Sequence, residues 1–132
     1  IYDRLGAMKA ARVTVFMDSC FSGSQRSGQM LASARGVAIK ARPMEPQGNM
    51  VVFTAAQGDE TAYPYREKSH GLFTYFLLKK LQTTAGDVSL GELGDYITRN
   101  VKMESLTAND KSQTPSVKAS AGLGDEWQSL KL

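Results

Sequence analysis

The sequence predicts an α/β fold with a mainly parallel sheet, and two patterns lead to this prediction. Two apolar runs, at residues 13–17 and 50–55, lack polar alternation, as do strands that are buried on both faces of a parallel sheet. Two helical patterns follow the second run, at about 71–82 and 90–103. Because so few strands cannot bury both faces of a sheet, we expect this chain to be the second half of a larger three-layer α/β/α domain.

The segments around the first strand are less regular. Residues 3–11 have the character of a helix end and lead into the run at 13–17. The segment 21–48 is rich in Ser, Gly and Gln at first, shows helical character near 29–34, and contains Pro43 and Pro46 later. We expect most of it to be a long exposed loop, and long loops in compact domains are usually functional.

The second half of the chain carries clearer signals. The first helix places four apolar side chains on one face, namely Phe73, Phe76, Leu77 and Leu81. The next helix opens with Ser89 and Glu92, which are spaced as a capping box in which each side chain bonds the other's amide. Pro115 then introduces a short strand at 116–119, and the tail residues Trp127, Leu130 and Leu132 are expected to pack back.

Composition excludes several classes of partner. The chain has 132 residues, 42% hydrophobic and 22% charged, as in one soluble globular domain. Its net charge of +3 comes from scattered basic residues, so we expect no nucleic-acid partner. No apolar run is long enough to cross a membrane, so we expect no membrane partner. The chain starts at Ile1 like an interior segment and shows no signal peptide, so its compartment stays open.

Cys20 is the only cysteine in the chain and directly follows the first apolar run. It has no disulfide partner, and one thiol makes a poor metal site. The carboxyl ends of parallel strands are where α/β proteins build their sites, which makes Cys20 a candidate nucleophile. The alternative is a small buried hydrophobic residue, which is the usual role of a free cysteine.

Three segments carry a family resemblance: VTVFMDSCFSGSQR, NMVVFTAAQGDETAY and HGLFTYFLLKKLQ. They resemble the caspase-like cysteine peptidases, in the bacterial branch near the metacaspases and paracaspases. The resemblance implies a caspase-like three-layer α/β/α fold, with residues 1–120 as the C-terminal part of the peptidase domain and 121–132 as a tail. Within that part it implies three regions: a nucleophile strand and loop at 12–23, an inter-subunit linker at 24–48, and a small-subunit-like part at 49–120.

The same resemblance implies roles for individual residues. Cys20 corresponds to the thiolate that attacks the peptide bond, and its backbone amide to part of the oxyanion hole. Asp18 and Glu60, with Asp59 as the alternative to Glu60, correspond to carboxylates of a pocket for Arg or Lys. From the residues alone, Asp18 could instead anchor loop amides, while Glu60 and Asp59 could be solvated loop charges.

The general base is the main departure from the family pattern. In the family it is a histidine in a His-Gly pair upstream of the cysteine, and no histidine precedes Cys20 here. The one histidine is His70, at the start of the helix near 71–82. We therefore expect the base to come from a segment N-terminal to this chain, with His70 as the alternative.

The family often cuts the linker between its two subunits. Four basic residues in this linker are candidate processing sites: Arg26, Arg35, Lys40 and Arg42. We expect peptides or proteins as substrates, and the N-terminal segment of the same domain as a partner. The sequence contains no nucleotide fingerprint and no cluster typical of zinc, so we expect no cofactor and no metal.

Two other functions fit parts of the pattern. The residues from Cys20 to Ser27 satisfy C-x-x-G-x-x-R-S, the phosphate loop of cysteine phosphatases, with Arg26 as the phosphate-binding arginine. The missing upstream histidine also fits a caspase-like interaction domain without catalytic activity.

Overall fold

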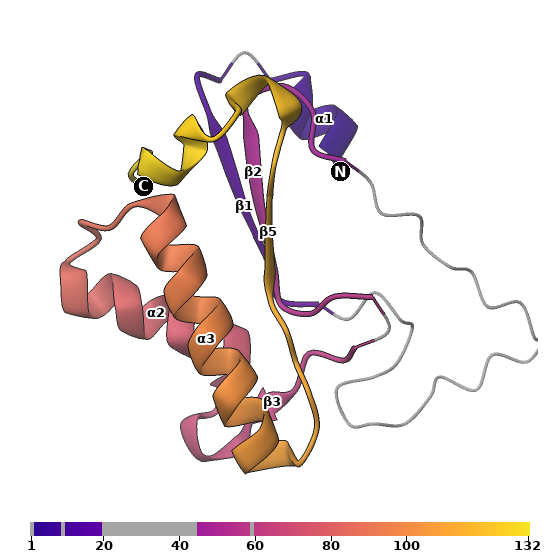
Figure 1. Cartoon of the computed structure of the whole chain (residues 1–132), viewed down its shortest axis with the longest axis vertical. Coiled ribbons are helices and arrows are strands. Elements are labelled where there is room, and N and C mark those ends of the chain that lie inside the picture. Colours follow the sequence, from indigo (N-terminus) through magenta and orange to yellow (C-terminus); the bar gives the residue numbers. More distant parts are fainter. Residues whose placement is uncertain (1, 9, 20–44, 59) are drawn as a thin grey trace, which may run out of the picture.

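The computed structural model describes residues 2–8, 10–19, 45–58 and 60–132 (Figure 1). The helices and strands follow in the order α1 (Tyr2–Gly6), β1 (Val13–Met17), β2 (Met50–Thr54), β3 (Pro64–Tyr65), β4 (His70–Gly71), α2 (Leu72–Thr84), α3 (Leu90–Asn109) and β5 (Ser116–Ala119). Short 3₁₀ helices lie at Arg66–Lys68, Ala121–Leu123 and Glu126–Ser129. The predicted α/β class is confirmed.

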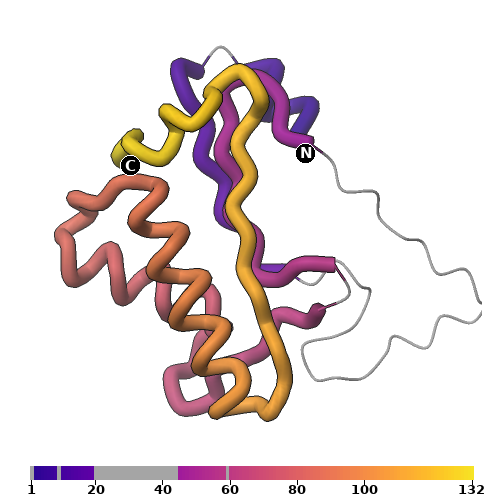
Figure 2. The backbone as a smooth tube through the Cα atoms, in the orientation of Figure 1, coloured from indigo at the N-terminus to yellow at the C-terminus, as the bar shows by residue number. Residues whose placement is uncertain are grey.

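The main sheet has the strand order β1-β2-β5. β1 and β2 are parallel, with Val13 opposite Met50 and Met17 opposite Thr54. The prediction that these two runs are neighbouring parallel strands is therefore confirmed. β5 runs antiparallel to β2, so this part of the sheet is mixed. The tube in Figure 2 shows the three strands side by side, with α2 and α3 against one face.

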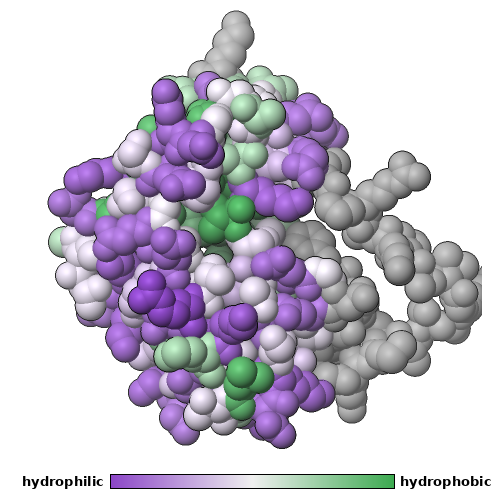
Figure 3. Space-filling model, in the orientation of Figure 1, coloured by the Kyte–Doolittle hydropathy of each residue, from purple (hydrophilic) through white to green (hydrophobic). Residues whose placement is uncertain are grey.

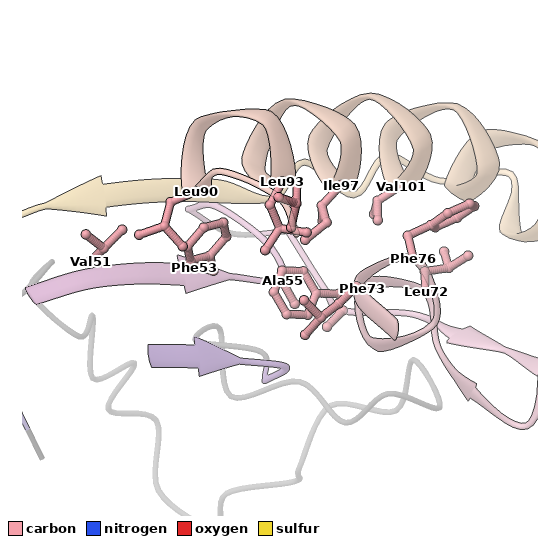
Figure 4. Close-up of a cluster of buried hydrophobic side chains, with 13 residues drawn as sticks. Val51, Phe53, Ala55, Leu72, Phe73, Phe76, Leu90, Leu93, Ile97 and Val101 are labelled. Atoms are coloured by element: carbon pink, nitrogen blue, oxygen red, sulfur yellow. The ribbon is translucent and has the colours of Figure 1, made fainter. Parts of the chain in front are cut away.

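The main core lies between the sheet and the two long helices (Figure 4). Val51 and Phe53 of β2 point toward α2 and α3, whereas Met50 and Val52 point to the opposite face. On the helix side the buried residues include Leu72, Phe73, Phe76, Leu90, Leu93, Ile97 and Val101. Burial of each such side chain contributes about 1.5–3 kcal/mol, which fixes both helices on the sheet. The opposite face holds a smaller cluster in which Tyr2 of α1 covers Met50 and Val52.

β1 departs from the prediction of a strand buried on both faces. All five of its residues are only half-buried, whereas four of the five in β2 are buried. In the described part of the chain β1 pairs with β2 along one edge and has no strand on its other edge. Its composition is that of a central strand, but its surroundings here are those of an edge.

The helix ends refine the predicted boundaries. Ser89 caps α3, because its Oγ accepts a hydrogen bond from the Glu92 amide at 3.2 Å. The reciprocal half of the capping box is absent, since the Glu92 carboxylate binds Lys80 at 2.7 Å instead. α3 continues beyond residue 103 to Asn109, where Asp110 takes a left-handed conformation with φ 55°. The N-terminal helix ends earlier than predicted, at Gly6.

The tail packs only in part as predicted. Trp127 and Leu130 lie against the main core, while 48% of the Leu132 surface is exposed. The Leu90 amide donates to the Leu130 carbonyl at 2.7 Å, which ties the tail to the start of α3. On the face seen in Figure 3, the apolar patches are small and separated by hydrophilic residues.

Candidate active site

A hollow of about 500 Å³ lies at the carboxyl end of β1. Its lining comes from four places: the residue after β1, the β3–β4 hairpin, the 3₁₀ turn between those strands, and the first turn of α2. The lining residues are Asp18, Pro64, Tyr65, Arg66, Ser69, His70, Gly71 and Thr74. Two of the residues singled out in the sequence, Asp18 and His70, are thus brought together.

Asp18 directly follows β1 and its carboxylate lies against the start of α2. Asp18 Oδ2 accepts a hydrogen bond from Thr74 Oγ1 at 2.5 Å. A Cβ atom at position 71 would overlap the same oxygen, so a larger residue there would require the Asp18 carboxylate to move. The N-terminus of a helix favours a nearby negative charge, which suits a carboxylate at this place.

The β3–β4 hairpin forms the other wall of the hollow. Tyr65 lies opposite His70 in its register, and the Leu72 amide donates to the Tyr63 carbonyl at 3.0 Å. His70 is exposed, so its ring is accessible at the hollow. The hydrogen bond of the Tyr65 hydroxyl to Glu104 of α3 raises the pKa of Tyr65 to about 12. The Tyr65 ring also meets Tyr75 edge-on, with centroids 5.0 Å apart.

Glu60 occupies a different place and is not among the residues that line the hollow. Its carboxylate accepts three hydrogen bonds from the segment before β5: from Thr114 N at 2.5 Å, Thr114 Oγ1 at 3.0 Å and Ser112 Oγ at 3.2 Å. These bonds hold the Glu60 carboxylate against the segment before β5. The pairing of Glu60 with Asp18 around a substrate stays a prediction.

Gln113 is a residue that the sequence analysis missed. Its side chain is fully buried and bridges two segments: Nε2 donates to the Ala55 carbonyl at 2.9 Å, and Oε1 accepts from Tyr63 N at 2.7 Å. Together with Glu60 it holds the connection after β2 against the start of β5. Thr74 was missed as well; its position one turn after the His-Gly pair was the available signal.

Other predicted site residues lie outside the described residues. They are Cys20, Asp59 and the candidate processing sites Arg26, Arg35, Lys40 and Arg42. The described chain reaches Ser19, so the hollow lies next to the point where Cys20 follows in the sequence.

The described ranges contain neither a metal-binding cluster nor a helix suited to cross a membrane. No three His, Cys, Asp or Glu side chains gather there as a metal site would require. Within the same ranges, no helix combines the length and apolar character needed to cross a membrane.

Comparison with known proteins identifies the family. The family model for the caspase domain, peptidase C14, matches residues 2–123. No curated protein and no solved structure gives a significant match. The family match spans nearly the whole chain and includes β1, β2, both long helices and β5. The chain therefore belongs to the caspase domain family of cysteine peptidases.

Proposed function

We propose that this protein is a cysteine endopeptidase that cleaves after Arg or Lys, with Cys20 as its nucleophile. One observation carries the proposal. The carboxylate of Asp18 lines a hollow at the carboxyl end of a parallel strand, two residues before Cys20 in the sequence. A substrate side chain held in this hollow brings its own carbonyl group close to the cysteine that follows.

The chemistry follows the general course of thiol proteases. The Cys20 thiolate attacks the carbonyl carbon, and amide donors stabilise the oxyanion that forms. Collapse of this intermediate breaks the C–N bond, and the amine leaves with a proton from the general base. Water then hydrolyses the thioester and restores the thiol.

The basic preference rests on the Asp18 carboxylate. Asp18 is the one acidic residue of the described lining and is half-buried, whereas the cationic Arg66 of the same lining is exposed to solvent. A carboxylate in such a place binds a guanidinium or ammonium group well. An acidic substrate side chain would meet a like charge there, which costs binding energy.

The general base is proposed to be a histidine from a segment N-terminal to this chain, as the family pattern implies. His70 is the alternative, because it is the chain's one histidine and borders the hollow. The neutral form of the base must come within hydrogen-bond reach of the thiol. Replacing His70 by Ala separates the two: activity persists under the proposal and vanishes under the alternative.

Fluorogenic peptides that differ only in the residue before the cleaved bond test the specificity. We expect cleavage after Arg and Lys, none after Asp or the neutral isostere citrulline, and none by Cys20→Ala. Asp18→Asn should cost about 2–5 kcal/mol in transition-state binding for the Arg substrate. The assay is run on this chain, where we expect no activity, and on the protein with its N-terminal segment. A preference for Asp would contradict the proposal.

Two further measurements separate the other functions. Mass spectrometry of the active protein should show self-cleavage at one or more of Arg26, Arg35, Lys40 and Arg42, absent in Cys20→Ala. Hydrolysis of an aryl phosphate that is inhibited by vanadate and lost in Arg26→Ala would instead establish a phosphatase. The absence of both activities from the longer protein would leave a non-catalytic interaction domain.

A further inference from the structure

We propose that Thr74 is a positioning residue for basic specificity: its hydroxyl holds the Asp18 carboxylate in the orientation that receives a guanidinium or amidinium group. This inference rests on the proposed function of the hollow. It assigns a role in substrate specificity to Thr74 of α2, although the negative charge of the hollow comes from Asp18.

The contact joins two separate elements. Thr74 lies on the first turn of α2, and its Oγ1 donates to Asp18 Oδ2 at 2.5 Å. Both residues line the same hollow. A short hydrogen bond to a charged acceptor is among the stronger ones in proteins, so it orients the carboxylate as well as holding it.

The backbone that carries the hydroxyl is firmly placed. The neighbouring residues Leu72 and Phe73 are 0% and 1% exposed in the main core. The Leu72 amide donates to the Tyr63 carbonyl, so this amide of the first turn is already used by the hairpin. The hydroxyl of Thr74 is therefore presented to Asp18 by a rigid part of the molecule.

Gly71 supplies the clearance for this arrangement. A side chain at position 71 would overlap Asp18 Oδ2, so glycine lets the carboxylate lie against α2 without being displaced. Gly71 thus leaves room for the Asp18 carboxylate, and the Thr74 hydroxyl holds it there.

The physical consequence concerns rotation of the carboxylate. The terminal torsion of Asp is broad and weakly restrained by its own geometry. A planar cation forms directional hydrogen bonds, so it binds best to a carboxylate whose plane is fixed. Without the Thr74 hydroxyl, Asp18 keeps its charge but loses this restraint, and we expect binding of a planar cation to weaken about tenfold.

The test uses this chain and two small probes, benzamidine as a planar cation and benzamide as its neutral counterpart. Dissociation constants are measured by NMR titration for the unchanged chain and for Thr74→Val, Thr74→Ser and Asp18→Asn. We expect the chain to bind benzamidine more tightly than benzamide, Thr74→Val to weaken benzamidine about tenfold, and Thr74→Ser to restore it. Benzamide binding should stay unchanged in all variants, a readout that a purely structural role of Thr74 would not produce.

The outcomes separate the two proposals. The Asp18 pocket itself would be overturned if the unchanged chain did not prefer benzamidine to benzamide. It would also be overturned if Asp18→Asn preferred benzamidine as strongly as the unchanged chain does. Weaker benzamidine binding by Asp18→Asn, together with normal benzamidine binding by Thr74→Val, would overturn the role of Thr74 alone. Addition of Thr74→Val to Asp18→Asn should cause no further loss, and a further loss would also count against positioning. Should Thr74→Val fail to fold by circular dichroism, Thr74→Ala replaces it and its result is judged in the same way.

Discussion

β1 and β2 contain the same kinds of residue, VTVFM and MVVFT, and run side by side in the same direction. β2 has a strand on each side, and its two faces are covered by the helices and by α1, so four of its residues are buried. β1 has one neighbour in the described part, and all of its residues are half-buried. The comparison shows that an apolar composition allows a strand to be buried, whereas the position of the strand in the sheet decides how far its side chains are buried.

The carboxylates that follow the two strands differ in the same way. Asp18, after β1, lines a hollow and shares it with the start of α2. Glu60, after β2, has its carboxylate occupied by the segment before β5. The half-buried strand therefore leads to an acidic residue that lines the hollow, and the buried strand leads to one held by the segment before β5.

The largest expected effect is the loss of stability when the aromatic ring that joins β1 to β2 is removed from either strand. The centroids of Phe16 in β1 and Phe53 in β2 lie 4.8 Å apart. Phe53 is 1% exposed, so Phe53→Ala should lower the free energy of unfolding by about 3–5 kcal/mol. Phe16→Ala should cost about half as much, because Phe16 is only half-buried. Urea denaturation measures both, and equal losses would show that β1 is as much a core strand as β2.

The next effect compares the two carboxylates. Glu60→Ala leaves the amide and hydroxyl of Thr114 without their acceptor, so stability should fall by about 1–3 kcal/mol. The pocket role that the resemblance implies for Glu60 also predicts weaker benzamidine binding in this variant. Asp18→Asn serves as the matched variant. We expect it to lose benzamidine binding and to lower the free energy of unfolding less than Glu60→Ala does. Normal benzamidine binding by Glu60→Ala would contradict the pocket role of Glu60.

Gly71→Ala tests how closely α2 approaches the end of β1. Its new methyl group would overlap the Asp18 carboxylate, so we expect a loss of about 1–3 kcal/mol in the free energy of unfolding. Gly122→Ala is the control, because a Cβ there meets nothing within 4 Å. Thermal and urea unfolding of the two variants should differ clearly, and similar curves would mean that Asp18 can move away from α2.

The smallest effect concerns the pH dependence of the hairpin wall. The pKa of Tyr65 is raised to about 12 from 10.0, chiefly by its hydrogen bond to Glu104. A group whose pKa is higher in the folded state stabilises that state below the unfolded value and loses this contribution as pH rises through the folded value. Stability from this contact should therefore be complete below pH 10 and decline toward pH 12. Absorbance of tyrosinate should show a late-titrating tyrosine that disappears in Tyr65→Phe; its persistence in that variant would contradict the assignment.

Much of the fold was predictable, because its signals are local. Apolar runs without alternation marked β1 and β2, and the period of apolar residues marked α2 and α3. The cap at Ser89 was readable from the spacing of two residues, and the helix–helix core followed from the same periodicity. The bonds of Gln113 to Ala55 and Tyr63 had no such signal, since a glutamine in a polar run gives no sign of its burial.

The sequence by itself determined the α/β class, the parallel pairing of the two apolar runs and the placement of Asp18 just before Cys20 at the end of the first. These follow from periodicity and from the order of residues along the chain, because both are set by residues close together in the sequence. Only the tertiary structure decided that Asp18 meets Thr74 and Gly71, that His70 borders the same hollow, and that Glu60 is held by the segment before β5. Each of these contacts joins residues far apart in the sequence, and their meeting depends on how the helices and strands pack rather than on any local pattern.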